Sequence, residues 1–163
     1  MLDFFYLFFS TILFRPYVFV FLALYLVTAV LQIGIARTLV FTLLAYSIAF
    51  LSEYSSTRTG FPYGFYSYIQ TTIDKELWIS NVPFMDSLSY SFLSYCSFSL
   101  AIFLNQEIIA KKNDISVMNF ENGMQKKTVL YSTVILFVLL DVIIDPVALR
   151  GSEWFLGQIY HYH

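Results

Sequence analysis

The sequence predicts an all-α integral-membrane protein, a polytopic bundle of about four transmembrane helices with an apolar half-helix at the N-terminus. Three observations lead to this fold class: 58% of the 163 residues are hydrophobic, only 12% are charged, and long uncharged stretches separate the charges. A water-soluble domain has about 25% charged residues, and this chain would leave large apolar patches in water. With no internal repeat or linker-like segment, residues 1–163 are expected to form a single domain.

The first segment, Leu2 to Phe14, is apolar and aromatic but too short to span a membrane. It has no basic start and no small-residue cleavage signature, so it does not resemble a signal peptide. We expect a half-helix at the membrane interface. Arg15 and Pro16 then mark the break into the first full span, because proline is tolerated at a helix start.

The spacing of the charges locates four spans, in the uncharged stretches 16–36, 38–52, 87–106 and 128–140. The second is short, so we expect it either to tilt slightly with Arg37 snorkelling at one end or to carry Glu53 at the membrane edge. In both cases Glu53 is expected to close this span. The fourth is too short to cross alone, so we expect its helix to continue through Asp141 and to stop near Pro146.

Four spans place the two long loops on opposite sides of the membrane. The loop 107–127 carries four lysines close to membrane ends, and we expect it to be a solvated, cytoplasmic connector. These lysines are Lys111, Lys112, Lys126 and Lys127. The unusual polar residues of the sequence gather on the opposite face of the membrane.

Several function classes are disfavoured by composition. The net charge is −2 and no basic run exceeds two residues, so no nucleic-acid partner is expected. The single cysteine, Cys96, excludes an internal disulfide and multi-cysteine metal sites. His161 and His163 are a weak metal signal at a chain end, and we expect no metal. Without a glycine-rich phosphate loop or a dinucleotide fingerprint, no cofactor is expected either. The oligomeric state stays open.

Three carboxylates are the candidates for chemistry. Asp141 and Asp145 are four residues apart and share one side of the last helix. Two poorly solvated carboxylates repel each other, so one is expected to hold a proton near neutral pH. Glu53 is expected at the C-terminus of its helix, where a negative charge is unfavourable against the helix dipole. Another interaction is therefore needed to explain why an acidic residue occurs at this position. The structural alternatives are that Asp145 ends its helix and pairs with Arg150, and that Glu53 is a membrane-edge charge bonded to Arg58.

A glycine- and proline-rich turn follows Glu53. Gly60, Pro62 and Gly64 are typical of a tight, irregular turn. The aromatic residues around it fit either an interfacial belt or the wall of a channel for a long apolar ligand. They are Phe61, Tyr63, Phe65, Tyr66 and Tyr68.

Three segments, SEYSSTRTGFPYGFYSY, ELWISNVPFMDSLSY and DVIIDPVALRGSEWFLG, resemble in their order and spacing the integral-membrane carotenoid-biosynthesis family. This family includes carotenoid 1′,2′-hydratases and bisanhydrobacterioruberin hydratases. The resemblance covers nearly the whole chain, although family members continue with further membrane helices, and we expect a fragment or a minimal homologue. The family pattern falls on Glu53, Gly60, Pro62, Gly64, Tyr66, Val82, Pro83, Asp141, Asp145, Pro146, Gly151 and Trp154.

The resemblance implies a cofactor-independent hydro-lyase that hydrates a terminal double bond of an acyclic carotenoid. An acid protonates the alkene to give a tertiary cation, and a base directs water to it. Asp141 is implied as the acid, with Glu53 or Asp145 as the base. Tyr66 is implied as a supporting hydroxyl. The implied substrate-binding residues are Arg58, Gly60, Pro62, Gly64, Tyr66, Tyr68 and Trp154.

The expected partners are a long apolar carotenoid and the lipid bilayer, in a prokaryotic inner membrane. Other interpretations remain open. The carboxylates could be interhelical hydrogen-bonding groups of a non-catalytic anchor or assembly subunit, or could mark the pathway of a solute or proton carrier. A cyclase or isomerase acting on another isoprenoid would begin with the same protonation.

Overall fold

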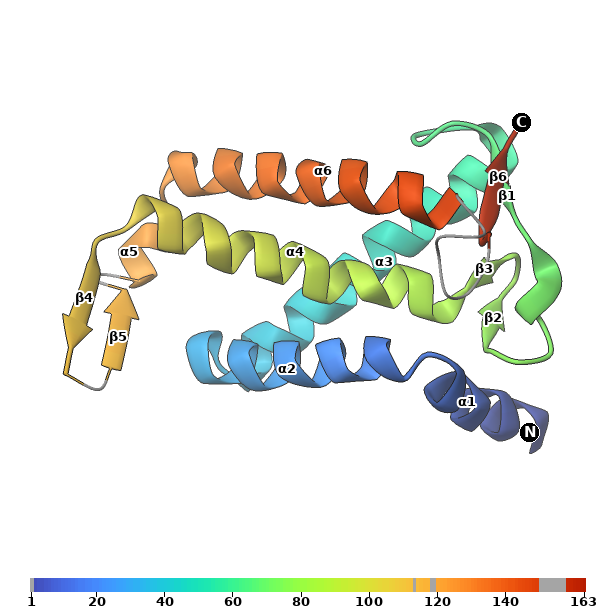
Figure 1. Cartoon of the computed structure of the whole chain (residues 1–163), viewed down its shortest axis with the longest axis horizontal. Coiled ribbons are helices and arrows are strands. Elements are labelled where there is room, and N and C mark those ends of the chain that lie inside the picture. The colour runs from blue at the N-terminus through green and yellow to red at the C-terminus, as the bar shows by residue number, and fades with distance from the viewer. Residues whose placement is uncertain (1, 113, 118–119, 150–157) are drawn as a thin grey trace. The chain divides into compact units, whose positions relative to one another are not determined.

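The structure is a computed structural model that describes residues 2–112, 114–117, 120–149 and 158–163 (Figure 1). Helices dominate these ranges, with three short antiparallel strand pairs, β1 with β6, β2 with β3 and β4 with β5. The helices are α1 Leu2–Phe14, α2 Pro16–Ile33, α3 Ile35–Thr59, α4 Phe84–Asn105, α5 Phe120–Met124 and α6 Lys127–Leu149, with a short 3₁₀ turn at Gln70–Thr72. The strands are β1 Tyr66–Tyr68, β2 Trp78–Ile79, β3 Val82–Pro83, β4 Ile108–Lys111, β5 Asp114–Val117 and β6 Tyr160–Tyr162.

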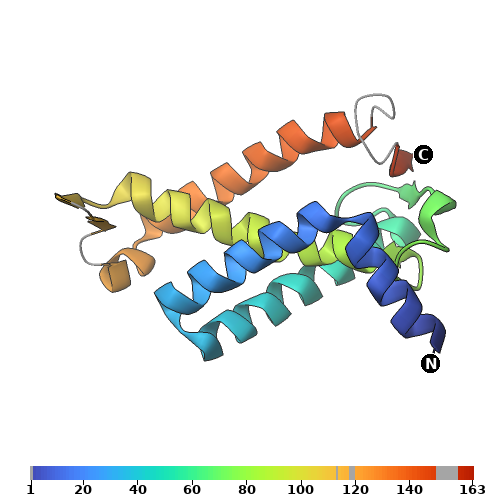
Figure 2. The same ribbon diagram turned by 60° about the horizontal axis from the view of Figure 1, so that its bottom comes forward.

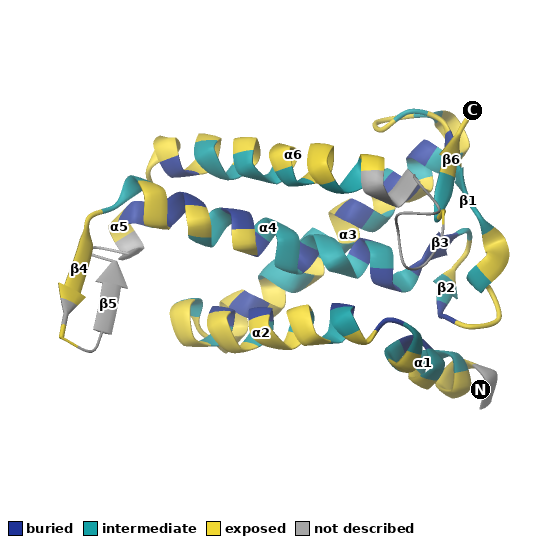
Figure 3. Ribbon diagram, viewed as in Figure 1, coloured by how far each residue is buried: buried dark blue, intermediate teal, exposed yellow. Residues whose placement is uncertain are grey.

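Four of these helices, α2, α3, α4 and α6, are long and apolar enough to cross a membrane. Their outward faces are apolar and exposed, as in Leu31 at 81% and Leu43 at 65% (Figure 3). Exposed leucines on this scale would be costly in water and are ordinary against lipid. Together with the shorter apolar helix α1, these helices confirm the predicted fold class.

The chain packs as two compact units. The first contains residues 1–92 and 145–163, and the second contains residues 93–144. The candidate residues Glu53 and Asp145 belong to the first unit, and Asp141 belongs to the second.

In the first unit, α2 and α3 form an antiparallel hairpin (Figure 2). Gly34 joins the helices with a φ of 84°, a conformation that glycine adopts without strain. Ala29 is fully buried, and the Tyr25 hydroxyl lies 2.6 Å from the Thr42 hydroxyl of the other helix. Small residues and interhelical hydroxyl bonds of this kind hold membrane helices together.

Two predicted helix ends are wrong. α3 does not close at Glu53 but runs to Thr59, where Gly60 caps it in the left-handed conformation. α6 does not stop near Pro146, which lies inside a helix that continues to Leu149. The charge spacing failed for Glu53 because hydroxyl groups satisfy its carboxylate inside the helix bundle. Prolines are likewise tolerated inside membrane helices, where neighbouring groups can satisfy the freed carbonyl.

A buried ionic network joins the start of α2 to the loop before α4. Arg15, only 3% exposed, forms an ion pair through its Nε with Glu76 Oε2 at 2.6 Å. Its Nη2 donates to Glu76 Oε1 at 2.8 Å, and its Nη1 donates to Asp86 Oδ1 at 2.6 Å. Burial disfavours the guanidinium charge, but Asp86 and Glu76 outweigh this effect and raise the pKa of Arg15. Arg15 is therefore a permanent cation that holds two carboxylates.

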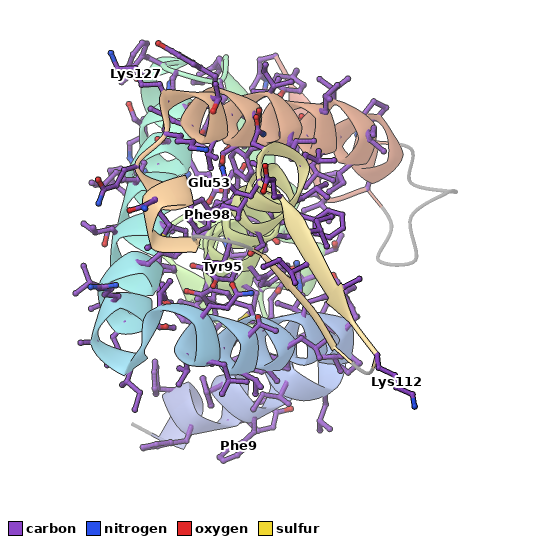
Figure 4. The ribbon with its side chains drawn as sticks, turned by 90° about the vertical axis from the view of Figure 1, so that its left-hand side faces the viewer. Phe9, Glu53, Tyr95, Phe98, Lys112 and Lys127 are labelled. Carbon is purple, nitrogen blue, oxygen red and sulfur yellow. The ribbon has the colours of Figure 1, made fainter. Side chains whose placement is uncertain are left out.

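The same loop anchors α1. The Thr11 hydroxyl accepts a hydrogen bond from the Leu77 N–H at 2.8 Å, and the Ser10 hydroxyl donates to the Lys75 carbonyl at 2.7 Å. The opposite side of α1 is exposed and aromatic, and Phe9 points away from the helices in Figure 4. α1 has 13 residues and a length of about 20 Å, too short to span a membrane.

In the second unit, Ala101, Ile102 and Val129 form a small apolar core. The Asn105 side chain donates to the Ser132 hydroxyl at 3.0 Å. Residues 107–127 contain the β4–β5 hairpin and α5, which is more regular structure than the solvated connector that the sequence suggested. The side of the membrane on which this loop lies stays a prediction.

We predict that Arg15→Gln lowers the free energy of unfolding by about 3–5 kcal/mol, because it leaves the buried carboxylate of Glu76 and the half-buried carboxylate of Asp86 without their cation. Arg15→Lys should recover only part of this loss, since an ammonium cannot reproduce the planar fork. Denaturant unfolding of the detergent-solubilised protein measures both. Arg37→Gln, at an exposed arginine, is the matched control and should change stability little. Equal effects at the two arginines would contradict the role of the network.

Candidate functional site

The site is centred on Glu53, whose side chain is labelled in Figure 4. Although charged residues are rarely buried alone, Glu53 is only 2% exposed. Its Oε2 accepts a hydrogen bond from the Ser87 hydroxyl at 2.5 Å, and the Tyr68 hydroxyl is a second partner. Among the described residues, no lysine or arginine forms an ion pair with Glu53. Its carboxyl group is therefore oriented by hydroxyl groups.

Arg58 has other partners than Glu53. Its guanidinium lies 3.5 Å above the centre of the Tyr54 ring and donates to Asn81 Oδ1 at 2.6 Å. It also donates to the Ser80 hydroxyl at 3.1 Å. Five residues after Glu53, Arg58 is on a different side of α3. The structure therefore contradicts the predicted alternative in which Arg58 forms a bond with Glu53 at the membrane edge.

The turn after α3 reverses the chain. Gly60 and Gly64 have φ angles of 79° and 95°, and the peptide bond between Phe61 and Pro62 is cis. The Gly64 N–H donates to the Gly60 carbonyl at 2.9 Å, which closes the turn. A Cβ atom at Gly64 would lie 3.6 Å from the Tyr162 ring. This turn directs β1 back towards α3, so that Tyr68 reaches Glu53.

β1 pairs with β6, and four tyrosines lie on one face of the two-stranded ribbon. Tyr68 is opposite Tyr160 and Tyr66 is opposite Tyr162, and alternate residues of a strand share a face. The rings of Tyr66 and Tyr160 are 5.5 Å apart, and those of Tyr68 and Tyr160 are 6.2 Å apart. We call Tyr66, Tyr68, Tyr160 and Tyr162 the tyrosine ladder.

The ladder hydroxyls next to Glu53 stay protonated. Burial, followed by the negative charge of Glu53, raises the pKa of Tyr66 and Tyr68 well above the usual value for tyrosine. The Tyr66 and Tyr68 hydroxyls also interact with each other. These groups are therefore neutral hydrogen-bond donors at physiological pH.

Asp145 contacts the same ladder. The Tyr160 hydroxyl donates to Asp145 Oδ1 at 2.7 Å. Arg150, the predicted structural partner of Asp145, lies outside the described residues, as do Gly151 and Trp154. The structure thus connects Glu53 and Asp145, two of the three predicted carboxylates, through tyrosines of one ribbon.

Asp141 lies one turn before Asp145 in α6, and its side chain is exposed within the described structure. His163 helps to close the ribbon, since its backbone N–H donates to the Phe65 carbonyl at 3.0 Å. Its Nε2 is 2.7 Å from the Ser67 hydroxyl. His161 lies within β6 and His163 directly follows it, beside the ladder.

Sequence reasoning missed Ser87, Tyr160 and Tyr162. The two ladder tyrosines of β6 could have been found, because the segment at 160–162 repeats the alternation of tyrosines seen at 66–68. Ser87 gives no such signal, since α4 contains many serines. Only the packing of α4 against α3 selects the serine that meets Glu53.

We predict that Ser87→Ala destabilises the protein by about 1–3 kcal/mol, because the buried Glu53 carboxyl loses a donor. In a Glu53→Gln background the same change should cost less. Ser97→Ala is the matched control. Ser97 is equally buried in α4, but its hydroxyl bonds the Leu93 carbonyl of its own helix. Unfolding in detergent measures each variant. If Ser87→Ala costs the same in both backgrounds, the Ser87 hydroxyl does not act on Glu53.

A family described as "Carotenoid biosynthesis protein" matches residues 8–161. No curated protein and no solved structure matches the chain. The matched range includes Glu53, the turn, Asp141, Asp145 and most of the ladder. The chain therefore belongs to the carotenoid biosynthesis protein family.

Proposed function

We propose that this membrane protein hydrates a terminal carbon–carbon double bond of an acyclic carotenoid. A role in carotenoid biosynthesis follows from its family. The observation that carries the finer proposal is the pair of carboxyl groups, Glu53 and Asp145, joined to one tyrosine ladder. Hydration of an alkene needs two such groups, one to give a proton and one to take a proton from water.

The proposed reaction adds water in two steps. Asp145 gives its proton to one alkene carbon, so the π electrons form a C–H bond and the other carbon becomes a tertiary cation. A lone pair of water then forms the C–O bond while Glu53 accepts one proton from that water. The alkene gains the Asp145 proton and the hydroxyl of water, Glu53 gains the other water proton, and no electrons are lost or gained overall. The reaction therefore needs no redox partner.

The assignment of roles follows from the contacts. Ser87 and Tyr68 hold the Glu53 carboxyl, which suits a base that must aim a water molecule. Tyr160 donates to Oδ1 of Asp145, and we assign Asp145 as the acid because the Glu53 carboxyl, with its two hydroxyl partners, is the better-oriented base. Asp141, the acid preferred from the sequence, remains an alternative supported by the sequence alone.

The aromatic surroundings suit the proposed cation. Tyr66 is 5% exposed, and electron-rich aromatic faces attract cations. A carotenoid would approach from the bilayer, where the exposed faces of the spanning helices are apolar. The substrate-binding roles proposed for Arg58, the turn residues Gly60, Pro62 and Gly64, Tyr68 and Trp154 rest on the resemblance.

We predict that the chain, expressed in a host that accumulates an acyclic carotenoid, produces a more polar pigment heavier by one water. Glu53→Gln and Asp145→Asn should each lower its formation at least about 100-fold, since each removes a proton-transfer group. Asp141→Asn tests the alternative acid. Chromatography with mass spectrometry measures the pigments at matched protein levels.

Glu107→Gln is the control, because Glu107 is an exposed carboxylate outside the site. A product with the mass of the substrate would favour a cyclase or isomerase. Unchanged pigments in the presence of membrane-inserted protein would contradict hydration and favour the anchor or assembly interpretation.

A further inference from the structure

A small pocket of the first unit lies beside the tyrosine ladder, where the ends of β1 and β6 meet the Arg15 network. Ile69 follows Tyr68 at the end of β1, and its N–H donates to the Ile159 carbonyl at 2.8 Å. Both isoleucines line the pocket, together with Arg15 and Trp78. The pocket wall therefore connects the ladder to the start of α2.

The pocket has an exposed rim and a buried floor. Thr71 and Gln158, which line it, are exposed. Arg15 and Pro83 also line it, and both are buried. Pro83 belongs to β3, which contacts α3, the helix that carries Glu53. The pocket thus extends from exposed loop residues to the buried interior of the first unit.

Trp78 supplies a hydrogen-bond donor to this pocket. Its indole Nε1 is buried, and none of the described residues accepts a hydrogen bond from it. A buried donor without an acceptor is unfavourable, so an acceptor is expected in the pocket that Trp78 lines. An indole N–H can only donate, so the occupant must offer an oxygen lone pair.

The size and the other polar groups of the pocket suit one water molecule. The pocket offers about 10 Å³ to the centre of a water, which is about the space that one water needs. The Thr72 hydroxyl bonds the Glu76 carboxylate, so its oxygen keeps a lone pair for a water. The Gln158 amide nitrogen donates to the Tyr160 carbonyl at 3.2 Å, which leaves the amide oxygen as a second acceptor. One donor and two acceptors are the surroundings that a buried water requires.

The charges around the pocket favour a neutral occupant. Arg15, the cation that lines it, is already paired with Glu76 and Asp86. An anion would therefore meet two carboxylates close to the guanidinium, and a cation would meet the guanidinium itself. A neutral oxygen group avoids both repulsions.

The pocket adjoins a residue that contacts the proposed base. The Trp78 and Tyr68 rings meet edge to face with centroids 6.0 Å apart, and the Tyr68 hydroxyl is a partner of Glu53. Glu53 is only 2% exposed, so bulk solvent does not reach it directly. Hydration nevertheless consumes one water per turnover, and this water needs a route from the solvent.

We propose that this pocket binds one water molecule through the Trp78 indole N–H and supplies it to the hydration site, an inference that rests on the proposed function. The bound water accepts from Trp78 and donates to Thr72 and Gln158. Once the tertiary cation forms, the water passes the Tyr68 ring, its oxygen forms the C–O bond and Glu53 accepts one of its protons. Solvent water then refills the pocket at its rim.

The first experiment detects the bound water by ultraviolet resonance Raman spectroscopy of the full chain in detergent, without carotenoid. A Trp154→Phe background leaves Trp78 as the one tryptophan, and its indole band reports whether the N–H is hydrogen-bonded. We expect a hydrogen-bonded N–H that becomes free in Thr71→Phe, which places a bulky ring at the rim. Gln70→Phe, at an exposed neighbour that does not line the pocket, is the matched control and should leave the band unchanged.

The second experiment measures the supply of water in deuterium oxide with an acyclic carotenoid. Asp145 then delivers a deuteron, and a cation that meets no water returns a proton from a neighbouring carbon to Asp145, which re-forms an alkene that carries deuterium. Thr71→Phe should therefore raise the ratio of deuterated recovered carotenoid to hydrated pigment about tenfold. Gln70→Phe should keep the wild-type ratio. General damage to the site lowers both products together and does not raise this ratio.

Trp78→Phe keeps the test decisive if Thr71→Phe does not fold. It removes the indole N–H, keeps an aromatic ring beside Tyr68 and should raise the same ratio. An unchanged ratio in the variants that fold overturns the proposal, and so does a free indole N–H in the protein that retains Thr71.

Two other outcomes assign the failure. An indole N–H that becomes hydrogen-bonded only after carotenoid is added means that an oxygen of the pigment occupies the pocket, and the water site is wrong. A wild type that forms neither hydrated nor deuterated pigment overturns the proposed function and the supply of water with it, while the Raman band still decides whether the pocket binds water.

Discussion

The buried charge of Arg15 is the constraint on which the first unit depends. A guanidinium at the start of a membrane helix must be neutralised, and here Glu76 and Asp86 do so from a loop and from the first turn of α4. This requirement fixes where α4 begins relative to α2. Because Ser87 follows Asp86 directly, the same constraint presents the Ser87 hydroxyl to Glu53. An ionic network outside the site thereby sets the geometry of the site.

Sequence reasoning succeeded where the governing physics is local. The spacing of charges identified the spanning helices, because each span must be apolar along its own length. The turn residues Gly60 and Gly64 indicated that the chain reverses after α3, and that reversal carries Tyr66 and Tyr68 towards Glu53. The carboxylates were found because ionisable groups in apolar segments are rare. These features can each be read within about 20 residues of chain.

The features that escaped prediction depend on residues far apart in the sequence. Arg15 meets partners 61 and 71 residues later, and Tyr160 meets β1 only through strand pairing. The helix ends near Glu53 and Pro146 were misjudged for a related reason. A charge or a proline was taken as a boundary, although groups from other segments can satisfy either inside a membrane helix. Only tertiary packing supplies those groups.

The separation between Arg15 and its partners also orders the biosynthesis of the protein. Ribosomes deliver the chain from the N-terminus, so α1 and α2 leave the ribosome before Asp86 does. Until then the Arg15 guanidinium lacks both carboxylates, and its charge keeps the junction between α1 and α2 in the hydrated headgroup region. Burial of Arg15 becomes favourable once the loop and the first turn of α4 arrive. The docking of α1 through this network therefore requires the later part of the chain that supplies Glu76 and Asp86.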